Sequence, residues 1–140
     1  MNIYLESSAA LRDLLDGEHG PLIRERLRAA DLVATSRLTL VEVGRVLARL
    51  RALEPQVAAT VAAREAQFES DSELWVIHPV DDAIWARCGR PFPCEPVRTL
   101  DAVHLATLEQ LSGAVEHLVM LSTDERVRAN AKTLGFAVEP

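Results

Sequence analysis

Four carboxylates occupy similar places in the sequence, each close to the point where an apolar strand-like segment meets a helix. Glu6 comes directly after the first expected strand, and Asp124 comes after the fourth. Glu42 lies one turn into the helix that follows the second strand, and Asp101 lies in the first turn of a later helix. In an open parallel sheet, ligands bind in the crevice beyond the carboxyl ends of the strands. The four side chains can therefore converge on one site.

Carboxylates gathered in this way repel one another unless a cation neutralises them. A hard divalent ion that prefers oxygen ligands, Mg²⁺ or Mn²⁺, removes this repulsion. An ion that keeps part of its water shell can activate a water molecule and stabilise the charge of a phosphate under attack. The pattern therefore indicates hydrolysis of a phosphodiester bond.

Each acid also has an explanation that needs no metal. Glu6, Asp101 and Asp124 could complement the dipoles of the helices that they precede or begin. Glu42 could pair with Arg45 three residues later, although it lies among apolar residues, where a carboxylate needs a partner. The repetition of the four acids at matching places in the topology is what favours a shared site.

The elements that would carry these acids alternate between short strands and longer helices, which is typical of an α/β fold with a parallel sheet. Ser7 with Ser8, Thr99 and Thr123 are placed to cap the helices that follow them. A loop rich in proline separates two of these helices. The expected strands are 2–5, 32–35, 75–80, 118–122 and a short edge strand over 136–139. The expected helices are 7–16, 22–30, 38–53, 56–68, 100–111 and 124–134, with a further short helix that starts at 81–82. The loop is 89–96.

Composition limits the kind of protein. The 140 residues, 49% of them hydrophobic, suffice for one domain with a sizeable core. A net charge of −6 argues against a broad surface that coats nucleic acid, although it is compatible with a local basic rim. No apolar run is long enough to span a bilayer, and the first residues lack the features of a signal peptide. We therefore expect a cytoplasmic protein in which Cys88 and Cys94 are reduced thiols, neither a disulfide nor a zinc site.

Four segments around the acids resemble the motifs of PIN domains of the VapC type, the toxin half of bacterial VapBC toxin–antitoxin pairs. Their order, spacing and intervening lengths agree with the family over essentially the whole chain, so the resemblance implies one PIN domain over residues 1–140. The segment that contains Asp101 is the most specific match. The four segments are Tyr4–Ala9, Ser36–Val43, Arg98–Thr107 and Leu121–Arg126.

This resemblance implies a PIN-like three-layer α/β/α sandwich with a central parallel sheet of about five strands. It also implies a metal-dependent endoribonuclease with Mg²⁺ or Mn²⁺ as its cofactor. In the family, the first and third acids are most directly tied to the metal. Carried over position by position, the catalytic and metal-site acids are Glu6, Glu42, Asp101 and Asp124.

Other side chains could assist such a site. The hydroxyls of Ser7 and Thr123 are candidates for orienting it through hydrogen bonds, although helix capping explains both residues equally well. His104, one helical turn beyond Asp101, could be a general acid or a hydrogen-bonded structural histidine. The arginines that could contact RNA phosphates, or simply face solvent, are Arg12, Arg37, Arg45, Arg49 and Arg98.

One position departs from the family pattern, because Glu6 stands where aspartate is usual. The longer side chain moves the carboxylate outward, and Mg²⁺ demands near-ideal octahedral geometry. The site could shift slightly, could favour Mn²⁺, or could bind metal poorly and cleave slowly. Because the other three acids are present, we expect activity to be retained, at the same or a lower rate. The alternative is a weakened PIN fold that acts mainly as a protein- or RNA-binding module.

The resemblance also predicts partners. Antitoxins of VapBC pairs are small proteins whose C-terminal segment wraps the toxin and can place a basic group in its acidic site. The helices over 38–68 offer a groove for a VapB-like segment of this kind, or are simply part of the core. The family further implies a homodimer, and nothing in the sequence indicates a membrane partner.

Overall fold

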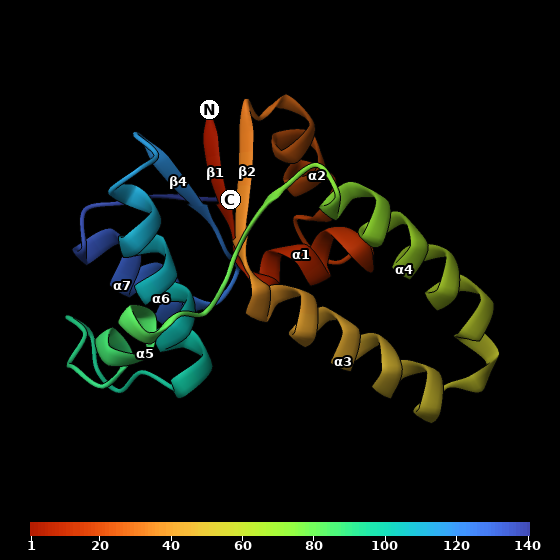
Figure 1. Cartoon of the computed structure of the whole chain (residues 1–140). Coiled ribbons are helices and arrows are strands. Elements are labelled where there is room, and N and C mark those ends of the chain that lie inside the picture. Colours follow the sequence, from red (N-terminus) through yellow and green to blue (C-terminus); the bar gives the residue numbers. More distant parts are fainter.

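In a computed structural model that describes residues 1–140, five short parallel strands form one sheet. Leu5, the last residue of the central strand, pairs in register with Thr35 and Leu121 of its two neighbours. The residues that follow these three positions therefore emerge along one edge of the sheet. The strands are β1 (Asn2–Leu5), β2 (Leu32–Ser36), β3 (Val76–His78), β4 (Leu118–Leu121) and β5 (Ala137–Glu139), in the order β3-β2-β1-β4-β5. Figure 1 labels the three central strands, β2, β1 and β4.

Helices cover both faces of this sheet, as Figure 1 shows. One group, drawn in red to yellow-green, packs on one face, and the other, drawn in green to blue, packs on the opposite face. None of the helices is long and apolar enough to cross a membrane. The first group is α1 (Ser7–Leu14), α2 (Gly20–Ala29), α3 (Arg37–Leu53) and α4 (Ala58–Ser72), and a 3₁₀ turn at Pro55–Val57 lies between α3 and α4. The second group is α5 (Asp82–Cys88), α6 (Thr99–Ser112) and α7 (Glu125–Thr133).

Two apolar cores hold the layers together. Successive side chains of a strand point to opposite faces, and β1 follows this rule. Ile3 and Leu5 belong to the core under α1–α4, whereas Tyr4 belongs to the core under α5–α7. A slip of one residue would exchange the two sets, so burial on both faces fixes the register of the strands. The predicted three-layer α/β/α sandwich with five parallel strands is confirmed.

Helix α6 is buried along most of its length, which explains why its apolar residues show no amphipathic stripe. It packs in the core with β2, β4, α5 and α7. Three polar residues of this helix, Asp101, His104 and Thr107, are also buried, and two of them are ionisable. A buried carboxylate or imidazole requires hydrogen-bond partners, and both have them at the edge of the sheet described below.

Several expected boundaries were wrong. Asp124, not Thr123, is the N-cap of α7, and Arg98 precedes α6, so that Thr99 is its first residue. Ser7 lies inside α1, whose N-cap residue is Glu6. The third strand is shorter than expected because Pro79, which lacks an N–H group, follows it. Helix α4 starts after the 3₁₀ turn and runs past Phe68 to Ser72.

Candidate active site at the carboxyl ends of the strands

The sheet brings the four predicted acids to the same edge. Glu6 follows β1 directly, and its backbone N–H donates to the carbonyl of Leu121 at the end of β4, at 3.0 Å. Asp124 follows three residues after Leu121, at the start of α7. Glu42 reaches this edge from α3, which begins immediately after β2, and Asp101 reaches it from the first turn of α6. The hydrogen bonds described next divide the acids into two groups, which we name after their centres: a buried half around Glu6 and His104, and an open half around the exposed side chain of Arg98.

Glu6 lies in the buried half, surrounded by serine hydroxyls. Its side chain is 4% exposed. The Ser7 hydroxyl donates to its Oε1 at 2.7 Å, and the Ser122 hydroxyl donates to its Oε2 at 2.8 Å. The Ser8 hydroxyl also donates to Oε2. These bonds connect β1, α1 and the end of β4 through one carboxylate.

Glu42 completes the buried half by pairing with His104 rather than with Arg45. Its Oε2 lies 2.7 Å from Nε2 of His104, and the other ring nitrogen lies 3.0 Å from the hydroxyl of Tyr4. Burial acts to raise the pKa of Glu42, but the hydrogen bond and the charge of His104, with smaller contributions from Ser7 and Arg98, together outweigh it. The pKa therefore lies below its ordinary value. Burial, together with the charge of Glu6, raises the pKa of Tyr4 well above its ordinary value, so the phenol stays neutral.

Asp101, Asp124 and Arg98 form the open half. The guanidinium of Arg98 donates to Asp101 at 2.8 and 3.4 Å and to Oδ2 of Asp124 at 3.3 Å. The Arg98 side chain is 63% exposed, whereas those of Asp101 and Asp124 are 11% and 27% exposed. Hydrogen bonding to Asp101, and the charges of Asp101, Asp124 and Glu6, raise the pKa of Arg98. The charge of Arg98 also acts on Glu42, so Arg98 is a cation held in the field of all four acids.

The two oxygens of Asp124 have separate partners. Oδ1 accepts the backbone N–H groups of Arg126 and Val127, at 2.9 and 3.1 Å, and so caps α7. Oδ2 faces Arg98. One oxygen of Asp124 thus serves the N-terminus of α7, and the other oxygen is available to the site.

The donor chemistry of the site suits a divalent cation. No three of its acidic or histidine side chains lie close enough together to hold an ion as they stand. Asp101 and Asp124 nevertheless already share one cationic group, the guanidinium of Arg98, and all four acids offer the oxygen ligands that Mg²⁺ and Mn²⁺ prefer. A divalent ion would fit by replacing Arg98 between these two carboxylates.

The other predicted residues differ in how they relate to the acids. The Ser7 hydroxyl donates a hydrogen bond to Glu6. The Thr123 hydroxyl makes no hydrogen bond, but the Thr123 backbone N–H donates to the Ser8 hydroxyl at 2.9 Å. Arg12 and Arg37 are exposed and form no ion pair with the acids. Arg45 and Arg49 are likewise exposed on α3.

Sequence reasoning missed two contributors, Ser8 and Ser122. Both hydroxyls donate to Glu6, and both lie within two residues of a predicted acid. The available signal was their place beside the ends of β1 and β4. Serine is common at such junctions because it caps helices, so residue type alone could not separate the two roles.

The loop before α6 is held by α7. The side chain of Asn130, buried in α7, accepts the backbone N–H of Cys94 at 2.9 Å and donates to its carbonyl at 3.0 Å. Glu95 accepts the backbone N–H groups of Phe92 and Val97. These hydrogen bonds fix the segment that leads to Arg98.

Cys88 and Cys94 are both free cysteines, as expected.

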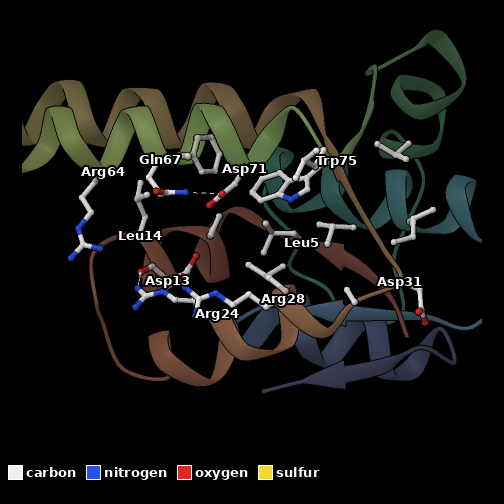
Figure 2. A pocket seen from close by; sticks show the side chains of 18 residues that line it. Leu5, Asp13, Leu14, Arg24, Arg28, Asp31, Arg64, Gln67, Asp71 and Trp75 are labelled. Carbon is white, nitrogen blue, oxygen red and sulfur yellow. Dashed lines mark hydrogen bonds and ion pairs between the residues drawn. The ribbon is translucent and has the colours of Figure 1, made fainter.

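A separate cavity of about 810 Å³ lies between α1, α2 and α4, and none of the four acids lines it. Figure 2 shows Leu14, Leu5 and Trp75 toward its interior and charged side chains around it. Arg24 is already paired with Asp13 there, at 2.8 Å. Of the helices over 38–68 that were predicted to offer a groove, only α4 lines this cavity, and α3 does not.

Residues 3–133 match the model of the PIN domain, and the chain therefore belongs to the PIN-domain family. Within that family, the chain is similar to proteins of the VapC type. It is 35% identical over 136 residues to Ribonuclease VapC46 of Mycobacterium tuberculosis, a match that covers 97% of this chain and 95% of that relative.

Two crystal structures are similar in fold. One is Mycobacterium tuberculosis VapC20, described as a sarcin-ricin loop cleaving toxin, with a TM-score of 0.62 and 16% identity over 99% of both chains. The other is VapBC2 from Rickettsia felis bound to a DNA fragment from their promoter, with a TM-score of 0.58 and 9% identity, covering 99% of this chain and 98% of that chain. At these identities the likeness concerns the fold.

Proposed function

We propose that this PIN domain is a metal-dependent endoribonuclease and the toxin component of a type II toxin–antitoxin system. The main support for this proposal is that Asp101 and Asp124 both contact one cationic group, the guanidinium of Arg98. Two further acids lie at the same edge of the parallel sheet, where ligands bind in folds of this kind. The ribonuclease name of the relative at 35% identity, matched over nearly the whole of both chains, supports RNA as the substrate.

Asp101 and Asp124 would hold the Mg²⁺ or Mn²⁺ ion, and Glu42 and Glu6 would add their negative charges to the site. The chemistry supplied at this place is activation of water and neutralisation of charge on the phosphate. His104 keeps Glu42 ionised and oriented, through their 2.7 Å contact. Arg98, once released from the two aspartates, is long enough and exposed enough to contact a phosphate of the RNA.

Replacing Arg98 with glutamine should separate ion binding from RNA binding. Loss of the competing guanidinium should tighten Mn²⁺ binding to the metal-free protein by roughly two- to fivefold, the range that exposed ion pairs span. RNA binding should weaken, and its dependence on salt should become less steep. Isothermal titration with Mn²⁺ and filter binding of RNA measure the two effects.

The control for this variant is Arg126→Gln, which removes an exposed arginine that lies near Asp124 in the sequence and forms no ion pair. Equal Mn²⁺ affinities of the two variants would show that Arg98 does not compete with the ion.

The cavity between α1, α2 and α4 is the place where we propose that a VapB-like antitoxin segment docks. Its apolar floor, which includes Leu14, Phe68 and Trp75, suits the apolar side of an amphipathic segment. The similarity to a VapBC2 complex supports a partner of this kind. Leu74 also lines this cavity and is 88% exposed, so it contributes little to the core. Leu74→Ser should then weaken the complex of the two proteins without changing RNA cleavage by the chain alone.

The activity itself is tested with a stem-loop RNA and an unstructured RNA, after mapping of any cleavage site. Because the proposed nucleophile is water rather than the ribose 2′-hydroxyl, an RNA with a single 2′-deoxynucleotide at the cleavage site should still be cut. Resistance of that RNA, with 2′,3′-cyclic phosphate ends on the normal products, would contradict the mechanism. Binding without cleavage of either RNA would instead favour the binding-module alternative.

A further inference from the structure

Three serine hydroxyls donate hydrogen bonds to the carboxylate of Glu6, which leaves few of its lone pairs free to bind an ion. A carboxylate has about four lone-pair sites. Here Oε2 accepts from Ser8 and Ser122, Oε1 accepts from Ser7, and Nε2 of His104 lies 3.9 Å from Oε1. With 4% of the side chain exposed, little of the carboxylate is open to solvent.

The two serines on Oε2 also connect Glu6 to the backbone beside Asp124. The Ser8 hydroxyl oxygen accepts the N–H of Thr123 at 2.9 Å, and the Ser122 hydroxyl oxygen accepts the N–H of Asp124 at 3.2 Å. Because each hydroxyl accepts from a backbone N–H, its own proton is free to point at Glu6. Two hydrogen-bonded paths therefore run from Glu6, through one serine each, to two consecutive residues.

We infer that Glu6 is a positioning residue, which acts through Ser8 and Ser122 to place the Asp124 carboxylate, and is not itself a ligand of the ion. The inference rests on the proposed function, because it concerns the same site. It also gives a reason for glutamate at this position. A side chain shorter by one methylene group could not reach all three serine hydroxyls from the end of β1.

This role reverses the order of activity that a ligand role predicts for substitutions. Glutamine keeps the length of the side chain and an acceptor oxygen for Ser8 and Ser122, and the Ser7 hydroxyl can rotate to accept from its amide. Aspartate keeps the charge but loses the reach. We therefore expect Glu6→Gln to bind Mn²⁺ at least as tightly as Glu6→Asp, whereas a ligand role requires Glu6→Asp to bind roughly tenfold or more tightly than Glu6→Gln.

The loss of one charge needs its own control, because a nearby negative charge attracts the ion even without ligating it. Glu125→Gln removes such a charge next to Asp124 from an exposed side chain that bonds none of the serines. The Mn²⁺ affinity of Glu6→Gln should lie within about threefold of that of Glu125→Gln, a difference below the cost of disturbing a group that supports a metal ligand.

Amide hydrogen exchange of Thr123 and Asp124 tests the inference without any metal. Both amides should keep the protection of the wild type in Glu6→Gln and should exchange faster in Glu6→Asp, while the amides of β1 serve as a check that each variant is folded. Unchanged protection in Glu6→Asp, or Mn²⁺ binding that is tighter in Glu6→Asp than in Glu6→Gln, would overturn the inference. If wild type and Asp101→Asn bind Mn²⁺ equally, it is the proposed function that fails, and the exchange result still decides the role of Glu6.

Discussion

Asp101→Asn should abolish RNA cleavage while leaving the protein folded. Asparagine has nearly the same shape but no charge, so it can neither hold a divalent ion as a carboxylate does nor form the two-pronged contact with Arg98. Changes to groups that only support a metal ligand lower activity by about 10–100-fold, so loss of a ligand should cost roughly a hundredfold or more. Cleavage rates of a fixed RNA, with Mn²⁺ binding measured in parallel, give the result.

The matched control for this variant is Asp82→Asn, because Asp82 is also an acid in the first turn of a helix but is exposed on α5. It removes the same charge from the first turn of a helix and should leave cleavage unchanged. A rate for Asp101→Asn within threefold of that of Asp82→Asn would remove Asp101 from the site.

His104→Leu should be the most destabilising change in the site. Leucine fills a similar volume but leaves the half-buried Glu42 carboxylate and the buried Tyr4 hydroxyl without their shared partner. Removing one partner of a buried polar pair costs about 2–4 kcal/mol. Tyr4→Phe breaks only one of the two contacts and should cost about 1 kcal/mol. Urea unfolding of the two variants measures both, and equal losses would show that the Glu42 contact contributes nothing.

The cost of His104→Leu should also depend on pH in a stated direction. His104 lowers the pKa of Glu42, so the folded state favours the ionised carboxyl. A lowered folded-state pKa gives stability that is fully present above the ordinary value of 4.5 and is lost as the pH falls through the folded-state value. The difference between wild type and His104→Leu should therefore shrink as the pH falls from 6 to 3. A difference that is constant over this range would mean that the carboxylate of Glu42 is not stabilised by His104.

The fold was predictable because its signals are periodic and redundant. Short apolar segments alternate with longer helical ones, and residues such as Ile3 and Tyr4 must face opposite cores, so the sheet and its layers follow from the pattern. Boundaries were less predictable. Thr123 and Asp124 are both good capping residues, and only the backbone geometry decides that Asp124 is the N-cap of α7.

Of the candidate site, the sequence predicted which acids come to one edge but not how each is held there. Topology requires Glu6 and Asp124 to emerge beside one another. The partners of the acids depend on side-chain directions that sequence spacing does not contain. Spacing suggested Arg45 for Glu42, yet the carboxylate turns toward His104 on a helix 62 residues away. The serines around Glu6 were hidden for the same reason.

The measurement that tests the central claim most directly is cleavage of RNA by the purified, partner-free chain after removal and return of metal. The metal-free protein should be inactive, and Mn²⁺ or Mg²⁺ should restore cleavage in wild type and in Asp82→Asn but not in Asp101→Asn. Cleavage that persists in EDTA, or that Mn²⁺ restores equally in Asp101→Asn, would contradict a metal-dependent ribonuclease at this site.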